Sequence, residues 1–140
     1  MNKECVFCEI ALGTQPASVV WEDELTLAFI DLRQFHAGHT LVIPRKHLHD
    51  IRELDHATGA ALMESVARIT RAVAAAFPNQ GLTLWHSVGE AADQEVPHLH
   101  FHVHPRMLGD QLLQVYPSAP TLPDKRIRDR YAETLRSYLN

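Results

Sequence analysis

The chain has 140 residues, of which 46% are hydrophobic and 21% are charged, and its formal net charge is −4. This length and composition predict one soluble globular domain with an ordinary core. No apolar run is as long as a membrane span and no signal peptide opens the chain, so we expect a cytoplasmic protein without a membrane partner. The negative charge disfavours general nucleic-acid binding, although one nucleotide could still occupy a local pocket.

Two cysteines, Cys5 and Cys8, form a Cys-Val-Phe-Cys sequence near the start of the chain. By itself this pair is compatible with half of a zinc site, a redox pair or two unrelated thiols. A redox pair usually follows a strand, and only four residues precede Cys5. Zinc would need two more ligands, for which the ten histidines of the chain are candidates.

Short hydrophobic runs bounded by polar residues, glycine or proline predict strands. These strands are expected over residues 19–21, 25–30, 39–43, 82–87 and 98–104. Apolar residues at helical spacing predict one long helix over 56–77, which ends at Pro-Asn-Gln-Gly. A loop over 88–95 separates the last two strands.

The chain after Arg106 is less regular, because three prolines mark an irregular connection. Residues 124–139 then predict an amphipathic helix whose basic residues face solvent. Its apolar stripe consists of Ile127, Tyr131, Leu135 and Tyr138. Strands outnumber helices and a helix separates them, so the fold class is α+β, with a mainly antiparallel five-stranded sheet, one long helix and a C-terminal helix.

Histidine and apolar residues alternate over residues 98–104. Successive strand residues point to opposite faces, so four histidines share one face and the apolar residues between them enter the core. The histidines are His98, His100, His102 and His104. An isolated His-x-His could be a metal site or only a polar face, but a third histidine in register, followed by Pro-Arg, favours chemistry.

These segments together resemble the histidine-triad (HIT) family of nucleotide hydrolases and transferases. The resemblance covers nearly the whole chain and rests on the segments Cys5–Ile10, Ala28–Asp31, Gly38–His47 and His98–His102. It implies the HIT-like fold, with residues 1–110 as the HIT domain and residues 111–140 as a C-terminal extension of the same domain. The transferase branch carries glutamine at the position of His102, so the histidine indicates the hydrolase side.

The resemblance implies hydrolysis through a covalent intermediate. His100 would attack the α-phosphorus of a purine nucleotide, and water would then release a nucleoside monophosphate, with AMP expected. The substrate would be a dinucleoside polyphosphate or a nucleoside phosphoramidate. A backbone carbonyl is expected to hold the proton on the other ring nitrogen of His100. His102 would donate a proton or only position the substrate, and His39 would support the triad through a hydrogen bond.

The nucleotide-binding residues carry over by position. Asp31 matches the acidic residue that accepts hydrogen bonds from ribose hydroxyls, and Gln94 matches a residue beside the phosphate. Five apolar side chains would form either a slot for the base or ordinary core. They are Val6, Phe7, Ile10, Phe29 and Leu32.

Zinc also carries over, onto Cys5, Cys8, His47 and His98, as one structural ion per chain that the chemical step does not require. The resemblance further implies a two-fold homodimer that pairs through the long helix and the strand near residues 82–87. The remaining histidines are expected to face solvent. They are His36, His49, His56 and His86.

Three residues depart from the family pattern. Ser87 stands where many members have asparagine, Glu95 stands where many have serine, and His104 replaces an apolar residue. Ser87 and Glu95 would still lie beside the phosphate. A carboxylate facing an anionic substrate is repulsive, so Glu95 is expected either to point away or to favour an amine as the leaving group.

Two other classes of function stay open. The first is a nucleotide-binding sensor or interaction protein with negligible turnover, which the retained His100 disfavours. The second is a metalloenzyme that uses His98, His100 and His102 as ligands, which would leave the cysteine pair without a purpose. No P-loop sequence is present, which argues against an ordinary NTPase.

Overall fold

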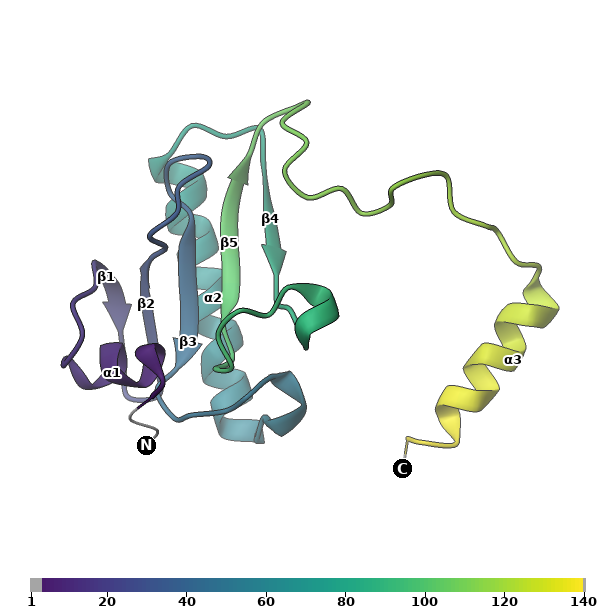
Figure 1. Cartoon of the computed structure of the whole chain (residues 1–140), viewed down its shortest axis with the longest axis horizontal. Coiled ribbons are helices and arrows are strands. Elements are labelled where there is room, and N and C mark those ends of the chain that lie inside the picture. The colour runs from purple at the N-terminus through teal and green to yellow at the C-terminus, as the bar shows by residue number, and fades with distance from the viewer. Residues whose placement is uncertain (1–3, 140) are drawn as a thin grey trace. The chain divides into compact units, whose positions relative to one another are not determined.

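The computed structural model describes residues 4–139. The chain divides into two compact units, residues 1–110 and 111–140. The first unit contains a five-stranded antiparallel sheet with the strand order β1-β2-β3-β5-β4 (Figure 1). Its strands are β1 (Val19–Glu22), β2 (Thr26–Ile30), β3 (Thr40–Pro44), β4 (Gly81–Trp85) and β5 (Phe101–Arg106). The predicted α+β class with an antiparallel sheet is confirmed.

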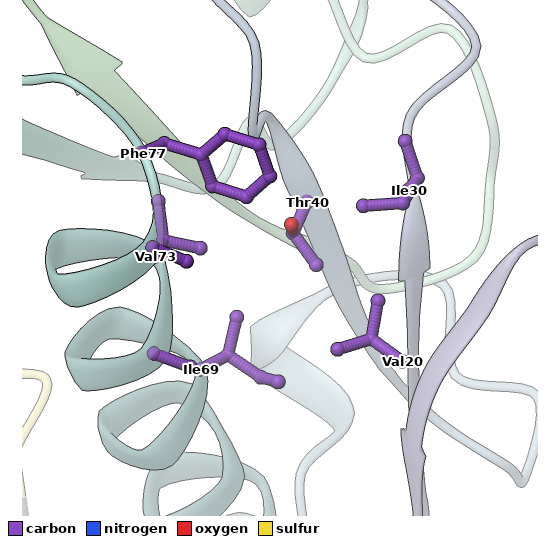
Figure 2. Close-up of a pocket in the computed structure, with 8 residues that line it drawn as sticks. Val20, Ile30, Thr40, Ile69, Val73 and Phe77 are labelled. Atoms are coloured by element: carbon purple, nitrogen blue, oxygen red, sulfur yellow. The ribbon is translucent and has the colours of Figure 1, made fainter.

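The long helix α2 (His56–Ala76) covers one face of the sheet (Figure 1). It begins at Asp55, whose side chain accepts a hydrogen bond from the amide of Thr58. The apolar stripe of α2 packs against alternate residues of the strands. These residues are buried because the helix face and the sheet face are both hydrophobic. This core contains Ala28, Val42, Leu62, Val66, Ile69, Val73, Leu99 and Val103. The apolar cavity in Figure 2, of about 230 Å³, lies on this same face between α2 and the strands.

The short helix α1 (Val6–Leu12), which was not predicted, packs on the other face. Seven residues are too few for a clear helical period, and the helix begins because the Cys5 thiolate or thiol accepts a hydrogen bond from the amide of Cys8. A second buried cluster forms here from Cys5, Phe7, Cys8, Leu27, Phe29, Leu41 and Ile43. The sheet is therefore covered on both faces near β2 and β3.

Strand β5 begins at Phe101, three residues later than the predicted start at His98. The neighbouring strand β3 ends at Pro44, which has no amide hydrogen to extend the ladder. The amide of Leu99 instead donates to the carbonyl oxygen of Leu48, at 2.7 Å. This departure from the sheet frees the backbone around His98 for contacts with side chains.

The remaining elements differ only slightly from the predicted ranges. Strand β4 ends at Trp85, before Ser87, and the loop after it contains the short 3₁₀ turn η2 (Glu90–Ala92). A second 3₁₀ turn, η1 (Ile51–Glu53), precedes α2. The second unit contains α3 (Lys125–Arg136), shorter than the predicted 124–139. Across residues 4–139, no helix has the length and apolar character needed to cross a membrane.

Candidate active site

His100 and His102 lie side by side on the face of the sheet that α1 covers, because Leu99 before them and Val103 after them enter the α2 core and Phe101 between them packs against it. Their ring centroids are 5.0 Å apart, and both side chains are buried. The predicted alternation of histidine and core residues is therefore confirmed. Phe7 of α1 packs edge-on against His100, with ring centroids 5.2 Å apart.

A backbone carbonyl determines which nitrogen of His100 carries the proton. Nδ1 of His100 donates to the carbonyl oxygen of His98 at 2.7 Å, as expected for a residue that must keep Nε2 unprotonated. Burial lowers the pKa of His100 below its ordinary value, although the His98 carbonyl opposes the shift. The ring is therefore neutral near pH 7, with a nucleophilic lone pair on Nε2.

One hydrogen bond joins the rings of His39 and His102. Nε2 of His39 lies 2.9 Å from Nδ1 of His102, and Nδ1 of His39 lies 3.2 Å from the carbonyl oxygen of Arg33. A carbonyl oxygen only accepts, so His39 donates from Nδ1, and its Nε2 accepts from Nδ1–H of His102. Nε2 of His102 then carries a lone pair. One additional proton on the pair would reverse this bond and make Nε2 of His102 a donor.

The surroundings keep this pair neutral. Burial is the largest cause that lowers the pKa of His102 to about 3, and the neighbouring His100 and His39 lower it further. Burial also lowers the pKa of His39, while the nearby carboxylate of Asp31 opposes the shift. Trp85 of β4 stacks on His102, with ring centroids 4.1 Å apart and an interplanar angle of 6°. The predictions did not include Trp85, whose only signal was its place on the neighbouring strand.

Asp31 is buried at the end of β2, beside His39. Its Oδ1 accepts a hydrogen bond of 2.8 Å from the amide of Arg33, and its Oδ2 lies 3.7 Å from Nε2 of His39. Asp31, His39 and His102 together lie close enough to hold a metal ion. The His39–His102 hydrogen bond already uses the facing nitrogen atoms, so we interpret the group as a hydrogen-bonded support.

An ion pair lies beside these residues. Nη1 of Arg33 is 3.1 Å from Oε2 of Glu95, and both side chains are more than half exposed. Arg33 was not among the predicted site residues, because its position two residues after Asp31 is its only local signal. The charge of Glu95 is therefore paired with that of Arg33.

The other predicted nucleotide-binding residues lie in different surroundings. Phe7 and Phe29 are buried and pack edge-on, with ring centroids 5.3 Å apart, and Ile10 packs against their cluster. Leu32 is fully exposed and is not a member of that cluster. Gln94 uses its side chain within the loop, where it accepts from the amide of Gly89 and donates to the carbonyl oxygen of His49.

Ser87 and the remaining histidines differ in how deeply they are buried. Ser87 is half-buried, two residues beyond β4. His104 is buried and donates from Nδ1 to the carbonyl oxygen of Pro105 at 2.7 Å. Solvent exposure was predicted correctly for His49 and His56. It was wrong for His36, which is half-buried and contacts Asp110 at 3.0 Å, and for His86, whose Nε2 accepts from the amide of Ile51.

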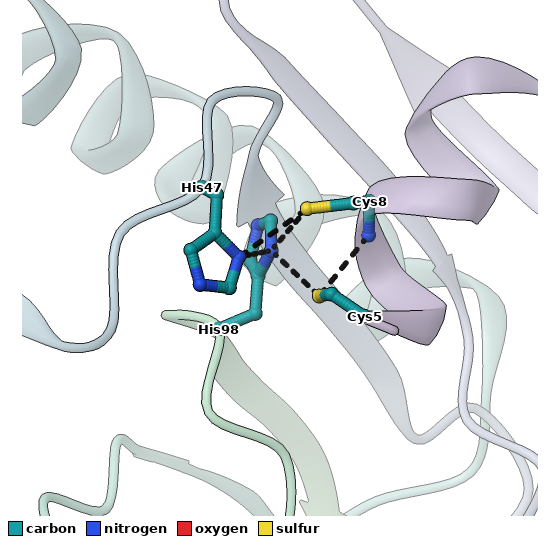
Figure 3. A group of neighbouring side chains, drawn as sticks. All are labelled: Cys5, Cys8, His47 and His98. Carbon is teal, nitrogen blue, oxygen red and sulfur yellow. Dashed lines mark hydrogen bonds between the residues drawn. The ribbon is translucent and has the colours of Figure 1, made fainter. Parts of the chain in front are cut away.

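The four residues predicted to bind metal form one cluster (Figure 3). Nδ1 of His98 lies 3.3 Å from Sγ of Cys5 and 3.5 Å from Sγ of Cys8. Nδ1 of His47 lies 3.3 Å from Sγ of Cys8 and 3.3 Å from Nδ1 of His98. The edges of a tetrahedral zinc site are about 3.4 Å between nitrogens and about 3.6 Å between nitrogen and sulfur, from ordinary bond lengths. The observed separations therefore fit one metal ion.

The hydrogen bonds of His98 also suit metal binding. Its Nε2 donates to the carbonyl oxygen of Pro44 at 2.9 Å, which leaves a lone pair on Nδ1 toward the cysteines. Burial lowers the pKa of His98 to about 4, so the ring is neutral. Within residues 4–139, His98, His100 and His102 do not together form a group that could hold a metal ion, which disfavours the alternative metalloenzyme.

The sequence and the fold match known proteins. The family model for the HIT domain matches residues 13–108. The chain is 39% identical over 104 residues to Protein hit of Bacillus subtilis, covering 74% of this chain and 72% of that protein. It is 33% identical over 122 residues to the adenosine 5′-monophosphoramidase of Schizosaccharomyces pombe, covering 86% of this chain and 89% of that protein.

Two further comparisons extend this match. The chain is 32% identical over 112 residues to an adenylylsulfatase of Arabidopsis thaliana, covering 80% of this chain and 57% of that protein. A crystal structure from Streptococcus mutans has a TM-score of 0.92 at 34% identity, covering 100% of this chain and 88% of that chain. The chain belongs to the HIT family.

Proposed function

We propose that this protein is a hydrolase that cleaves a purine nucleotide at its α-phosphate and releases a nucleoside monophosphate, with AMP as the expected product. The observation that carries the proposal is the bond from Nδ1 of His100 to the His98 carbonyl, which leaves Nε2 as a neutral nucleophile beside the His39–His102 pair. The relatives named as a monophosphoramidase and an adenylylsulfatase support hydrolysis of adenylyl compounds.

The reaction would proceed in two displacements. In the first, Nε2 of His100 forms a bond to the α-phosphorus, and the bond from phosphorus to the leaving group breaks with its electron pair. Binding of the anionic substrate would bring one additional proton to the His39–His102 pair, which makes Nε2 of His102 a donor. The leaving group would take this proton from Nε2 of His102. In the second, water attacks the phosphorus, the nitrogen–phosphorus bond breaks, and Nε2 of His102 accepts the proton of the water. Both histidines then return to their starting states.

The nucleoside half of the substrate would bind beside Asp31 and α1. The Asp31 carboxylate would accept hydrogen bonds from the vicinal ribose hydroxyls. Phe7, Ile10 and Phe29 lie together on this side and support an apolar surface for the base. Leu32 is exposed to solvent and would contact the base from outside this cluster. Ser87, Gln94 and Glu95, from the segment before β5, would lie on the phosphate side. The substrate would be a dinucleoside polyphosphate or a nucleoside phosphoramidate.

Turnover tests this function directly. Adenosine 5′-phosphoramidate and diadenosine triphosphate would be incubated with the wild-type protein and with His100→Ala, and AMP would be measured by chromatography. We expect AMP from the wild type, no detectable turnover by His100→Ala, and a nucleotidyl adduct on His100 by mass spectrometry of a quenched reaction. The exposed His49→Ala is the matched control and should retain activity.

Two outcomes would overturn the proposal. Wild-type turnover by His100→Ala would exclude His100 as the nucleophile. Nucleotide binding without turnover by the wild type would instead support the sensor or interaction protein with negligible turnover.

We also propose that Cys5, Cys8, His47 and His98 hold one structural zinc ion per chain. The paired thiols and the unprotonated Nδ1 of His98 support this choice, because zinc favours tetrahedral sulfur and nitrogen ligands. Cys5 and Cys8 do not form a disulfide, which fits the reducing cytoplasm that we propose for this protein. The chemical step itself would need no cofactor.

A homodimer that pairs through α2 and β4 is proposed as the assembly, without nucleic acid or a membrane as partner. Strand β4 is an edge strand of the sheet, and its Leu84 is 43% exposed. We expect light scattering to give the mass of two chains, and Leu84→Lys to shift the protein toward one chain. Leu12→Lys, at a more exposed apolar position on α1, is the control. A stable monomer at micromolar concentration would contradict the assembly.

A further inference from the structure

The backbone of Arg33 is hydrogen-bonded to two residues of the candidate active site, Asp31 and His39. Its amide donates to Oδ1 of Asp31 at 2.8 Å, and its carbonyl oxygen accepts from Nδ1 of His39 at 3.2 Å. Its side chain is 69% exposed. The main chain at Arg33 is therefore held beside the active site, while the guanidinium group is free to change partners.

The guanidinium group lies between two carboxylates. Its Nε is 3.7 Å from Oδ1 of the buried Asp31, and its Nη1 is 3.1 and 3.3 Å from the two carboxylate oxygens of Glu95. The contact with Glu95 joins two segments that are 62 residues apart in the sequence. The ion pair thus connects the segment that follows β2 to the segment that precedes β5.

The charges of Arg33 and Glu95 affect the pKa of His100, the proposed nucleophile. Arg33 lowers the pKa of His100 and Glu95 raises it, as secondary effects beside burial. Arg33 also lowers the pKa of His102 and His39. The charges of Arg33 and Glu95 therefore lie within electrostatic reach of the rings that would act on the α-phosphorus.

An exposed ion pair contributes little net stability, so an anionic ligand can replace one partner at small cost. A guanidinium group matches the geometry of phosphate or sulfate oxygens and can bind them through two parallel hydrogen bonds. A neutral amine offers no such acceptor. The Arg33–Glu95 pair can therefore distinguish leaving groups by their charge.

We propose that Arg33 binds the anionic leaving group of the substrate and that Glu95 limits this binding by competing for Arg33. The inference rests on the proposed function, because it assigns the leaving-group end of the same site. It makes Arg33 the specificity-determining residue and Glu95 its competing counter-ion. Removing Glu95 should then improve the use of anionic leaving groups only while Arg33 is present.

Two substrates with the same adenylyl half provide the test. Adenosine 5′-phosphosulfate releases an anion, whereas adenosine 5′-phosphoramidate releases ammonia. We expect Arg33→Gln to lower kcat/KM for the phosphosulfate about tenfold and to leave that for the phosphoramidate within about twofold, as for a lost hydrogen bond to a charged group. Arg33→Lys should lie between, because it keeps the charge and loses the planar fork.

The double variant separates competition from direct repulsion. Glu95→Gln should raise kcat/KM for the phosphosulfate about fivefold, by freeing Arg33. In the Arg33→Gln background this gain should disappear. A gain that persists would show that Glu95 repels the substrate by itself and would overturn its role as a competitor. The exposed ion pair of Lys125 and Asp129 on α3 provides the control. Asp129→Asn should change kcat/KM for neither substrate.

Binding gives a second readout that needs no turnover. Calorimetry would compare ADP with AMP, because the additional phosphate of ADP occupies the leaving-group position. We expect the preference for ADP to fall in Arg33→Gln and to increase in Glu95→Gln. An ADP-to-AMP affinity ratio that is equal in all three proteins would overturn the inference. Loss of turnover in the wild type, with these ratios still changed, would count against the proposed hydrolase and not against Arg33.

Discussion

The carbonyl oxygen of His98 accepts a 2.7 Å hydrogen bond from Nδ1 of His100, while the ring of His98 belongs to the Cys/His cluster. One residue therefore connects the proposed zinc site to the proposed nucleophile. The His98 ring is itself held by the Pro44 carbonyl at the end of β3. The cluster, the end of β3 and the position of His100 form one connected unit.

Loss of the metal is expected to destabilise the fold more than it slows the chemical step. Cys8→Ser should lose the bound zinc and lower the melting temperature on the order of 10 °C, since α1 is attached to the sheet through the cluster. Elemental analysis and calorimetry measure these effects, with His49→Ala as a control. A variant that lacks zinc and melts at the wild-type temperature would contradict a structural role.

Acid should destabilise the protein partly through His102. Its pKa falls from 6.5 to about 3 on folding, so the unfolded chain takes up the proton first. The stability from its neutral state is complete above pH 6.5 and is lost as the pH falls toward 3. His102→Gln should reduce the loss of unfolding free energy between pH 6.5 and 4 by about 3 kcal/mol. Urea unfolding at several pH values measures it, and an unchanged pH slope would refute the prediction.

Nucleotide binding should be accompanied by proton uptake. The His39–His102 pair is neutral and one proton short of making Nε2 of His102 a donor. A bound phosphate places negative charge beside the pair, which raises its proton affinity. Calorimetric titrations of AMP at pH 7, in buffers of different ionisation enthalpy, should show uptake of up to about one proton. His39→Asn removes the partner of His102 and should abolish the proton uptake. Equal binding heats of the wild type in all buffers would exclude proton uptake.

Gly38 is required by the packing of the segment that carries Arg33 and His39. Its φ is +111°, and an added Cβ would lie 2.7 Å from the ring of Phe77. Gly38→Ala should lower the free energy of unfolding by about 2–4 kcal/mol. Gly59→Ala within α2 meets only Leu54, at 3.8 Å, and should be neutral or stabilising. Denaturant unfolding compares the two variants, and equal stabilities would show that the contact with Phe77 is relieved at no cost.

Much of the architecture follows from local pattern. The apolar stripe of α2 and the alternation around Leu99 and Val103 specify one helix face and one sheet face, because their periods are properties of the backbone. The resemblance to the HIT family supplied the four residues that are predicted to bind metal, and the structure brings them together. These predictions depend on spacing along the chain or on motifs, so they could be made before the fold was known.

Other features depend on which distant segments meet. The end of β3 at Pro44 moves the start of β5 to Phe101, and the Arg33–Glu95 pair joins loops whose sequences give no sign of each other. The protonation of His39 follows from a carbonyl oxygen that only the folded loop places beside it. Periodicity along the chain predicts the long helix, the strands and the line of histidines. The layer formed by α1, the charge partners and the proton positions appear only in the folded chain, because they depend on contacts a few ångströms long between residues far apart in the sequence.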